Sequence, residues 1–594
     1  MVRVAVLDRE RCREDKCSRE CIRFCPMVRI RREAIRQGED KKPVIVESLC
    51  SGCGICVQKC PFKAITIVNL PEQLVGEEVH RFGPNGFSLY RLPIPRRGAV
   101  AGLVGRNAIG KTTMLRILSG ELVPNLGRIQ QLPTPDQVVE HFAATPLQDY
   151  FQNLYSGKTR VVYKPQHVDR IPLVVKGKTR DLLERVNERG HLDSVVKALE
   201  LEEILDREIG VLSGGELQRL AIATALCRDV DVYLFDEPSS HLDVYQRIQV
   251  ARIVRGLLEE GKMVLVSEHD LAVLDYLSDT VFLLYGRPQI YGITSNIHVV
   301  REGINRYISG YIPDENIRFR DRPIEFHVKP PTTMSVKTRV LLRWSDITKE
   351  YSGFRLRVSR AEVGEGEVIG ILGRNGLGKT TFVRILAGSE KPDTGEVQTK
   401  ETMRISYKAQ YLSGTITGRI GEALEEAAGK KDLGSWFSSR VLMPLHVQDL
   451  LEKEVGELSG GELQRAAIAI CLSRDAEIYL LDEPSAYLDV EERLAMARAI
   501  RSIVSDRRVT AFVVEHDIVA QDFIADKIMV FKGQPGREGS APEPLSLKDG
   551  MNSFLGDVGV TFRRDPSTKR PRVNKEGSKL DREQKGSGEY YYYS

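Results

Sequence analysis

The chain repeats one pattern of hydrophobic and polar positions twice. A short apolar run, AVAGLV in the first copy and EVIGIL in the second, precedes a glycine-rich loop and an apolar helix, MLRILSG or FVRILAG. Further on, DVDVYLFDEP and EIYLLDEP each show a nearly unbroken apolar run that ends in two acidic residues and a proline. Such runs are typical of strands buried on both faces of a parallel sheet, whose carboxyl ends form ligand sites. The pattern predicts two α/β domains related by duplication.

The two glycine-rich loops match the P-loop pattern G-x4-G-K-[ST] in its expected place between a strand and a helix. In a P-loop, backbone N–H groups and the helix N-terminus cradle phosphates, and the lysine reaches the β- and γ-phosphates. We therefore predict two ATP sites. Their loop residues are Gly105, Arg106, Asn107, Ala108, Ile109, Gly110, Lys111, Thr112 and Thr113 in the first copy, and Gly373, Arg374, Asn375, Gly376, Leu377, Gly378, Lys379, Thr380 and Thr381 in the second.

The paired acids after the long apolar runs predict a magnesium ligand and a catalytic group in each copy. We expect Asp236 and Asp482 to hold Mg²⁺ directly or through water, together with the hydroxyls of Thr112 and Thr380. The neighbouring glutamates, Glu237 and Glu483, are expected to polarise the attacking water.

Between each P-loop and its acidic strand stands the motif LSGGELQR, at residues 212–219 and 458–465. The Ser-x-x-Glu spacing before an apolar helix also fits a capping box. A capping box does not require two consecutive glycines, whereas a close backbone approach to phosphate does. We therefore predict that both motifs contact ATP, through Ser213, Gly214, Gly215, Glu216, Ser459, Gly460, Gly461 and Glu462.

Eight of the ten cysteines precede residue 61, and the second group of four follows the C-x2-C-x2-C-x3-C-P pattern of bacterial-type ferredoxins. In that pattern the fourth cysteine binds the other cluster, so two [4Fe-4S] clusters are expected. Four-cysteine zinc sites and a disulfide framework are the alternatives. The remaining Cys227 and Cys471 are expected to be core thiols. The predicted ligand sets are Cys12, Cys17, Cys21 and Cys60 for one cluster, and Cys25, Cys50, Cys53 and Cys56 for the other.

Composition adds little beyond these motifs. The 594 residues are 42% hydrophobic and carry 86 basic against 82 acidic side chains, a net charge of +4. No apolar run approaches the roughly 18–20 residues that span a bilayer, and the N-terminus is charged where a signal peptide is apolar. We therefore expect a soluble, cytoplasmic protein without a membrane partner. Residues 1–71 are locally basic, with 15 Lys and Arg against 9 Asp and Glu, which favours contact with phosphate backbones or merely offsets anionic clusters.

The LSGGELQR motif, with the P-loops and acidic strands, resembles the signature of ABC-type ATPases. In that family the signature of one cassette closes over ATP held by the P-loop of the other. The resemblance implies further roles for three pairs of residues. They are the Q-loop glutamines Gln166 and Gln410, which also reach Mg²⁺, the D-loop aspartates Asp243 and Asp489, and the switch histidines His269 and His516.

The spacings agree between copies except at one place. Signature serine and strand aspartate are 23 residues apart in both copies, whereas P-loop lysine and Q-loop glutamine are 55 residues apart in the first and 31 in the second. The extra residues, at about 134–160, have apolar positions at helical spacing broken by Thr-Pro and Ser-Gly. They predict a helix–loop–helix insertion, which is either a partner contact or a tolerated surface addition.

Aromatic side chains 24 to 29 residues before each P-loop lysine are candidates for stacking on adenine. As core aromatics they would show the same pattern, so both interpretations stay open. The candidates are Phe82 and Phe87 in the first copy, and Tyr351 and Phe354 in the second.

Twin cassettes with an eight-cysteine head, an insertion in the first cassette only and a basic tail resemble ABC subfamily E, also called the RNase L inhibitor family. The resemblance covers residues 1–594 and implies an α/β fold with two cassettes head to tail, after an α+β ferredoxin-like domain with two 4Fe-4S clusters. It implies five segments: residues 1–71, the cluster domain; 72–297, the first cassette; 298–340, a hinge; 341–538, the second cassette; and 539–594, a second hinge and tail.

That family splits ribosomes into subunits after release or rescue factors have acted, then remains on the small subunit. The resemblance thus implies an ATP-hydrolysing recycling factor, monomeric, with intramolecular pairing of its cassettes. The hinge segments, including Arg318, Phe319, Arg320 and Phe562, Arg563, Arg564, are candidate contacts to ribosomal RNA. An ATPase coupled to electron transfer and the ATPase subunit of a transporter are the alternative functions.

Two departures indicate unequal ATP sites. The first P-loop has Ala108 where the second has Gly376, and alanine tolerates a positive φ less well than glycine. In the first D-loop, His241 replaces the tyrosine usual in the family, which the second D-loop retains as Tyr487. We therefore do not expect equal turnover at the two sites.

Overall fold

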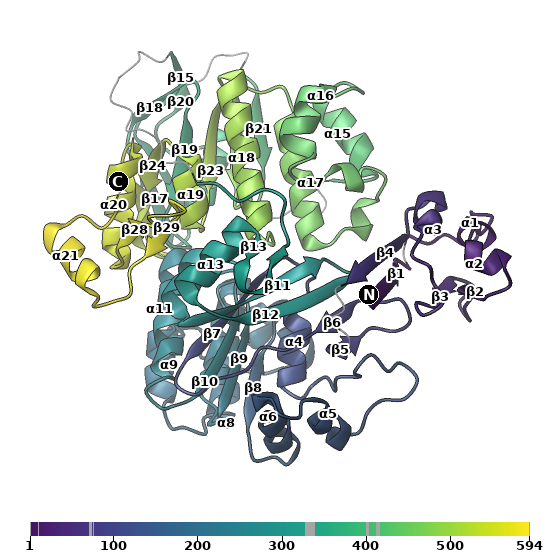
Figure 1. Ribbon diagram of the computed structural model, residues 1–594. Helices are drawn as coiled ribbons and strands as arrows, with labels where there is room; N and C mark the ends of the chain where they lie inside the picture. Colours follow the sequence, from purple (N-terminus) through teal and green to yellow (C-terminus); the bar gives the residue numbers. More distant parts are fainter. Residues whose placement is uncertain are drawn as a thin grey trace.

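The protein forms two α/β cassettes stacked on one another, with a small cysteine-rich domain beside them (Figure 1). The computed structural model describes residues 2–9, 11–70, 74, 76–326, 339–398, 403–410 and 416–592. Part of the predicted first hinge, residues 327–338, and the terminal Tyr593 lie outside the described residues.

In the part of the N-terminal domain that the structure describes, there are two antiparallel strand pairs and three short helices. Its strands are β1 Val2–Leu7 paired with β4 Ile65–Leu70, and β2 Ile35–Gln37 paired with β3 Pro43–Ile45; its helices are α1 Glu20–Arg23, α2 Pro26–Arg29 and α3 Ile55–Lys59.

One buried side chain fastens this domain to the first cassette. The amide of Asn85 donates to the carbonyls of Ala5 and Ile45, both at 2.9 Å, and its oxygen accepts from the Ile45 N–H at 2.6 Å. Since a buried amide with unpaired groups is costly, these bonds hold the small domain in a fixed orientation on the cassette.

The first cassette contains one eight-stranded sheet in the order β5-β6-β12-β11-β7-β10-β9-β8. The strand before the P-loop, β7, is central and pairs in parallel with β10 and β11. The strands are β5 Glu78–Arg81, β6 Ser88–Tyr90, β7 Val100–Gly105, β8 Val161–Lys164, β9 Val232–Asp236, β10 Met263–Ser267, β11 Thr280–Arg287 and β12 Tyr291–Val299. The helices are α4 Lys111–Leu118, α5 Pro135–His141, α6 Pro146–Tyr155, α7 Ile171–Val174, α8 Thr179–Arg185, α9 Leu192–Ala198, α10 Gly214–Leu226, α11 Val244–Gly256 and α12 Leu271–Leu277.

Helices α5 and α6 form the helix–loop–helix insertion. Thr134 caps α5 in a complete capping box, and each helix has a proline in its first turn. The apolar side of the pair packs on the cassette: Phe151 is fully buried, and the hydroxyl of Tyr150 donates to the Leu118 carbonyl at 2.6 Å. The insertion is thus anchored to the end of the P-loop helix α4.

The second cassette distributes the equivalent strands over three sheets. Its main sheet has the order β21-β22-β23-β19-β24-β27, with β19 between the parallel strands β23 and β24. The strands are β15 Val340–Trp344, β16 Ile347–Tyr351, β17 Phe354–Val358, β18 Ala361–Gly364, β19 Val368–Leu372, β20 Val397–Gln398, β21 Ile405–Lys408, β22 Ile478–Asp482, β23 Thr510–Val514, β24 Lys527–Val530, β25 Lys532–Gln534, β26 Glu538–Ala541 and β27 Leu545–Ser546. The helices are α14 Lys379–Leu386, α15 Ile420–Ala428, α16 Gly434–Phe437, α17 Gly460–Ser473, α18 Val490–Arg507, α19 Ile518–Ile524 and α20 Leu547–Val558.

This cassette extends beyond the predicted boundary at residue 538. Strand β26 begins at that residue and pairs with β17, and β27 pairs with β24 of the main sheet. Helix α20 buries Met551 and Leu555 in the hydrophobic core. Hydrogen bonding and burial therefore join residues 539–558 to the second cassette, and the second hinge begins after them.

Two segments link the cassettes. The first comprises α13 Val300–Ser309, β13 Tyr311–Ile312 and β14 Ile317–Arg318; the second comprises β28 Phe562–Arg564, β29 Pro571–Val573 and α21 Lys579–Ser587. The β28–β29 hairpin lies where the cassettes meet (Figure 1). There Arg572 binds Asp275 of α12 through two nitrogens, at 2.6 and 2.7 Å, and Arg564 binds Asp522 of α19 at 2.7 Å.

The two aspartates occupy matching places, six residues after each switch histidine. A second arginine, Arg570, which is fully buried, also pairs with Asp275, at 3.2 Å. The hairpin therefore holds one helix of each cassette by the same kind of ion pair.

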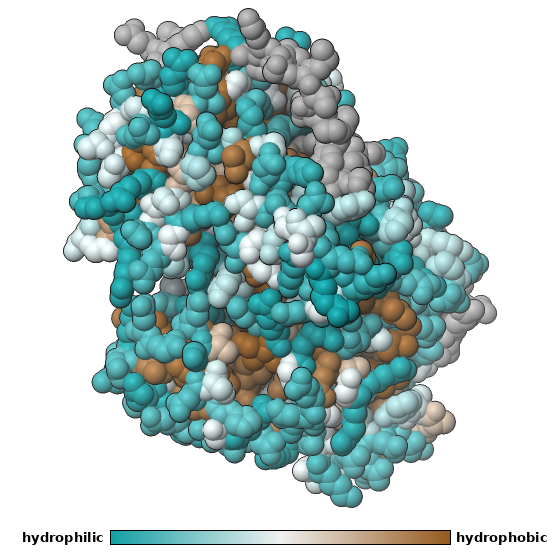
Figure 2. Space-filling view, turned by 90° about the vertical axis from the view of Figure 1, so that its left-hand side faces the viewer, coloured by the Kyte–Doolittle hydropathy of each residue, from teal (hydrophilic) through white to brown (hydrophobic). Residues whose placement is uncertain are grey.

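A chain suited to a membrane would need apolar features in its helices and on its surface. In the described part of the chain, no helix combines the length and the apolar character that crossing a bilayer requires. The face seen in Figure 2 is mostly hydrophilic, with apolar residues in small groups.

Two candidate ATP sites and a cysteine-lined pocket

Both P-loops turn sharply into their helices. Gly110 and Gly378 precede α4 and α14 with φ values of 104° and 87°, a conformation that favours glycine. The lysine that follows each of them is buried and donates to carbonyls of its own loop, Lys111 to those of Gly105 at 2.9 Å and Arg106 at 2.8 Å. Lys379 makes the same bonds to Gly373 and Arg374.

An acidic side chain with an unpaired oxygen stands at the end of each catalytic strand. Asp236 accepts from the Thr112 hydroxyl at 2.6 Å through Oδ2, while its buried Oδ1 has no hydrogen-bond partner. Burial is the main cause that raises the pKa of Asp236, and it raises that of Asp482 to about 6. Because a buried carboxylate needs a compensating partner, the pair of oxygen ligands fits Mg²⁺ beside the P-loop threonine.

The predicted catalytic glutamates are each surrounded by their predicted partners. Glu237 Oε1 lies 3.2 Å from Nε2 of His269 and accepts from the Gln166 amide at 2.8 Å. In the second site, Glu483 Oε1 lies 3.3 Å from Nε2 of His516.

These neighbours keep both glutamates ionised. Burial opposes the charge of Glu237, but His269 and Lys111 outweigh it and hold its pKa far below the usual range. At Glu483, burial is likewise outweighed by His516, Lys379 and Gln410, which lower its pKa to about 2. Each glutamate can therefore accept a hydrogen bond from water at neutral pH.

Each site is completed by the opposite cassette. The Asn107 N–H of the first P-loop donates to Oδ2 of Asp489 at 3.0 Å, and the Asn375 N–H of the second donates to Asp243 at 2.9 Å. Both aspartates also cap the helix that follows them, α18 and α11. The D-loops thus cross between cassettes, so the two sites are composite and related by pseudo-twofold symmetry.

The signature motifs form the capping boxes that their spacing allows. Ser213 caps α10 and Ser459 caps α17, each accepting from a glutamate N–H three residues later. Both serines remain exposed at their helix ends. A helix N-terminus that combines exposed N–H groups with glycines suits the binding of phosphate.

The candidate aromatics divide into two kinds. Phe87 and Phe354 pack behind the P-loops, since a Cβ on Gly110 or Gly378 would lie 3.0 or 3.1 Å from their rings. Phe82 and Tyr351, in contrast, are 48% and 44% exposed, so a base could approach them.

The sequence differences between the sites have structural counterparts. Ala108 has a φ of 56°, in the left-handed region where its glycine equivalent Gly376 has 76°. The rings of His241 and Tyr487 meet edge to face, with centroids 6.0 Å apart.

Three kinds of feature at the sites were missed in the sequence. Lys164, buried at the end of β8, donates to the carbonyls of Asp236 and Glu237 at 2.9 and 3.3 Å, and burial lowers its pKa to about 8. Glu237 itself has a φ of 46°. The Gln218 amide of α10 also donates to the Glu237 carbonyl, at 2.7 Å.

The second copy repeats all three features with Lys408, Glu483 and Gln464. The signal that could have found the residues was their recurrence, YK before each Q-loop and a glutamine inside each LSGGELQR.

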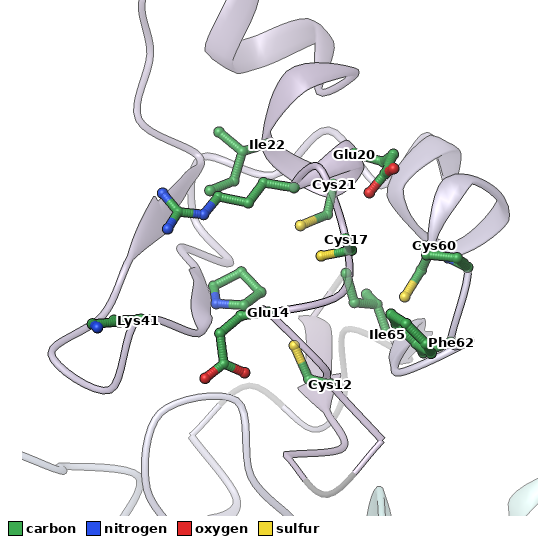
Figure 3. A pocket seen from close by; sticks show the side chains of 13 residues that line it. Cys12, Glu14, Cys17, Glu20, Cys21, Ile22, Lys41, Cys60, Phe62 and Ile65 are labelled. Atoms are coloured by element: carbon green, nitrogen blue, oxygen red, sulfur yellow. The ribbon is translucent and has the colours of Figure 1, made fainter.

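The cysteine-rich domain brings its eight thiols together in the two predicted sets. Cys12, Cys17, Cys21 and Cys60 line one pocket and point into it from a loop, α1 and the end of α3 (Figure 3). Burial, with the neighbouring thiols, raises the pKa of Cys21 to about 12. Around Cys56, whose pKa burial raises to about 11, the interacting thiols are Cys50, Cys53 and Cys25.

Such crowded, buried thiols fit iron–sulphur clusters, whose iron stabilises thiolates. Among the described residues, no three His, Cys, Asp or Glu side chains are arranged to hold a single metal ion.

Two of the proposed RNA contacts are engaged inside the protein. Arg320 pairs with Glu491, and Arg564 pairs with Asp522. Arg318 is exposed and stacks on Tyr311. Arg320 is held by the partly exposed Glu491 and Arg564 by the buried Asp522, so contact of either arginine with RNA stays a prediction that would require it to leave its carboxylate.

Three family models match the chain. One described as ABC transporter matches residues 95–240 and 356–486, one described as possible Fer4-like domain in RNase L inhibitor matches residues 2–33, and a 4Fe-4S binding domain matches residues 43–66. The N-terminal domain is therefore an iron–sulphur domain, which decides against the zinc and disulfide alternatives.

Full-length relatives share this organisation. The chain is 44% identical to ABC transporter E family member 1 of Arabidopsis thaliana, over 100% of this chain and 99% of that protein. A solved structure of ribosome-bound archaeal Pelota and ABCE1 is 51% identical with a TM-score of 0.92, covering 100% of this chain and 99% of that chain. An archaeal recycling factor in complex with the ribosomal stalk protein aP1 is 51% identical with a TM-score of 0.83, covering 88% and 100%. These relatives confirm the predicted fold class.

Proposed function

Because the chain belongs to the RNase L inhibitor family, ABC subfamily E, we propose that it is an ATP-driven ribosome recycling factor. The observation that carries this function is the joint presence of an iron–sulphur domain and two ABC cassettes along the whole length of ribosome-bound relatives. The protein is an ABC-type ATPase that splits ribosomes into subunits after termination or rescue. Its partners are the small subunit and a release or rescue factor, and its place is the cytoplasm.

The cassettes act as a clamp with two ATP sites. ATP held at Lys111 is sealed by Ser459, Gly460 and Gly461 of the opposite cassette. ATP held at Lys379 is sealed by Ser213, Gly214 and Gly215. The D-loop contacts between Asn107 and Asp489 and between Asn375 and Asp243 support this pairing. Closure therefore requires both cassettes and both nucleotides.

Hydrolysis reopens the clamp. Glu237 and Glu483 orient the attacking water, while His269 and His516 hold these glutamates in place. The P-loop lysines release their loop carbonyls and turn to the phosphates. Thr112, Gln166 and Asp236, or Thr380, Gln410 and Asp482, would hold Mg²⁺, which would supply charge neutralisation for the transferring phosphoryl group.

The iron–sulphur domain transmits the motion. Asn85 ties it to the first cassette, and Arg13 lies 3.6 Å from Glu457, two residues before the second signature serine. A change in the angle between cassettes therefore moves this domain against the ribosome. The clusters act as structural supports, and a redox titration in which cluster reduction altered the ATPase or splitting rate would contradict this role.

Sedimentation of ribosomes tests the proposal. Ribosomes are incubated with the protein and a release or rescue factor, with ATP or a non-hydrolysable analogue. We expect splitting in both cases, and retention of the protein on the small subunit only with the analogue. A Glu237→Gln, Glu483→Gln double variant with ATP should behave as the analogue does. Intact ribosomes and no bound small subunit in every sample would reject the function.

A further inference from the structure

The two composite ATP sites share one plan but hold their P-loop arginines differently. Arg106 and Arg374 occupy the same place, after the first glycine of each P-loop, and each faces the first turn of the helix behind the opposite D-loop. In the first site that turn carries Glu491, and in the second the equivalent residue is Tyr245. The duplicated chain thus provides an internal comparison.

Among the described residues, each arginine forms one ion pair, but the acid comes from a different position. Nε of Arg106 lies 3.8 Å from Glu491. Nη2 of Arg374 lies 2.5 Å from Glu200, and its guanidinium lies 4.3 Å above the ring of Tyr245. The residue equivalent to Glu200 beside the first site is His446, whose pKa is lowered by burial and by Arg106. The acidic partner of the arginine therefore follows the D-loop at the first site, as Glu491, and precedes the signature motif at the second, as Glu200.

Glu491 has a second set of contacts, which come from the first hinge. Its carboxylate pairs with Arg320 and lies 3.4 Å from the hydroxyl of Tyr307. Arg320 is held firmly, because it also donates to the carbonyls of Tyr307 at 2.7 Å and Ile308 at 3.0 Å and stacks on the Tyr307 ring. Helix α13, which carries Tyr307, packs on β11 of the first cassette. The Glu491 carboxylate of the second cassette is thus bound by Arg320 of the hinge and lies beside Arg106 of the first P-loop.

We propose that Glu491 is a positioning residue for the first ATP site, which couples the first P-loop to the hinge through Arg106 and Arg320. At the second site, Tyr245 occupies the equivalent position and carries no charge that a hinge arginine could bind. ATP binding at the first site therefore depends on the position of the hinge, whereas ATP binding at the second depends on Glu200. This inference rests on the proposed clamp and adds to it a difference in regulation between its sites.

Steady-state ATP hydrolysis by the full-length protein tests the coupling. The Glu483→Gln background leaves the first site hydrolysing, and the Glu237→Gln background leaves the second. We expect Glu491→Gln to raise KM for ATP about threefold to tenfold in the first background, with kcat changed less than about twofold, as expected for a partly exposed ion pair. In the second background neither constant should change. The mirror variant, Glu200→Gln, should raise KM only in the second background.

A double-mutant cycle with Glu491→Gln and Arg320→Gln, measured by the same KM, distinguishes an effect of the hinge from a local disturbance of the site. If the hinge acts through Glu491, Arg320→Gln raises KM at the first site, and adding it to Glu491→Gln has no further effect. Glu491→Tyr, which copies the second site, should give Arg106 the stacking that Tyr245 gives Arg374, but abolish the effect of Arg320→Gln. Thermal unfolding checks that each variant is folded.

Equal changes at both sites after Glu491→Gln, no change at either, or full additivity with Arg320→Gln would each overturn the proposal. Absence of any hydrolysis by the wild-type protein would instead reject the ATPase function itself, so the two failures are distinguishable.

Discussion

At the scale of single residues, the sites depend on backbone positions as much as on catalytic side chains. The carbonyls of Asp236 and Glu237 face inward and are held by Lys164, with Gln218 adding a second bond to Glu237. Glu237 adopts a left-handed φ of 46°, which costs about 1 kcal/mol or more in a residue with a side chain. The buried lysine therefore stabilises a strained turn that aims the glutamate at the site.

Replacing Lys164 by methionine should disturb this turn at one site only. The change preserves volume but removes the lysine bond from the Asp236 carbonyl and leaves the Glu237 carbonyl with Gln218 alone, at a cost of about 1–3 kcal/mol in stability. We expect hydrolysis at the first site to fall about tenfold, measured in the Glu483→Gln background. Lys408→Met is the matched control and should act on the second site alone. A reduction confined to the opposite site would contradict the assignment.

A buried acid in the second cassette predicts a pH dependence of stability. Burial is the main cause that raises the pKa of Glu515 from 4.5 to about 7, while Ser485 donates two bonds to it. The folded state then binds more protons than the unfolded state between these values. The contribution of Glu515 to stability is therefore complete below about pH 4.5 and is lost as pH rises through 7.

Glu515→Gln removes this titration. The difference in unfolding free energy between variant and wild type should move in favour of the variant by about 2–3 kcal/mol between pH 4.5 and 8. Urea unfolding followed by tryptophan fluorescence reports on the second cassette, which contains Glu515, because both tryptophans, Trp344 and Trp436, lie in that cassette. A difference that moved in the opposite direction would show that Glu515 is ionised when folded.

At the scale of elements, α10 and α17 combine two tasks at one N-terminus. Their serines cap the helix in a capping box and, in the proposed clamp, also meet the nucleotide of the opposite P-loop. These tasks are separable by substitution because aspartate caps a helix as well as serine does.

Ser213→Ala and Ser213→Asp should therefore differ in stability, while both impair ATP binding. Loss of the cap in the alanine variant should cost about 1 kcal/mol, measured by urea unfolding, while the aspartate variant stays close to wild type. Both should raise KM for ATP at the second site, aspartate more strongly because its charge repels phosphate. Ser459→Asp should affect the first site instead. Wild-type kinetics in Ser213→Asp would leave the serine with a capping role alone.

Most of these elements could be predicted from the sequence, for a physical reason. Strands β7, β9, β19 and β22 are buried on both faces and have continuous apolar runs, and the P-loop glycines need a conformation that few other residues adopt. The insertion was predicted because Thr134 and two prolines mark the starts of its helices.

What escaped prediction depends on contacts distant in sequence. The end of the second cassette was placed too early because β26 and β27 are short, and only their pairing with β17 and β24 reveals them. The sequence indicated exposed, basic hinge arginines, whereas in the structure Arg320 pairs with Glu491 and Arg564 pairs with Asp522. Charge patterns alone do not show which charges are paired.

At the scale of the whole molecule, the C-terminal hairpin ties the cassettes together through buried ion pairs. Arg570 and Arg572 meet Asp275 on α12, and Arg564 meets Asp522 on α19. Because these helices follow the switch histidines directly in the chain, the hairpin connects the two ATP sites through α12 and α19. Removing the Asp275 carboxylate leaves the buried Arg570 without its ion-pair partner and Arg572 with Asp565 alone, at 3.5 Å, which is costly.

Asp275→Asn should destabilise the hairpin by about 3–5 kcal/mol and loosen it from the first cassette. We expect faster hydrogen exchange in β28, β29 and α21, followed by mass spectrometry, with exchange in the central sheets unchanged. Asp557→Asn, which breaks the half-exposed pair with Lys532, is the control and should leave exchange unaltered. Unchanged protection of the hairpin in Asp275→Asn would show that apolar packing alone holds it.

The hairpin that fastens the cassettes together is translated after both of them, because its residues follow both cassettes in the chain. Domains fold in order from the N-terminus as translation proceeds, at roughly 5–20 residues per second. Both cassettes are thus complete before β28, β29 and the buried Tyr591, which bonds to Asp522, emerge. A chain cut before residue 559 would carry every nucleotide-binding motif and still lack one of the two segments that link its cassettes. Both cassettes can therefore fold before the hairpin reaches them, and the ion pairs at Asp275 and Asp522 form only when the hairpin docks.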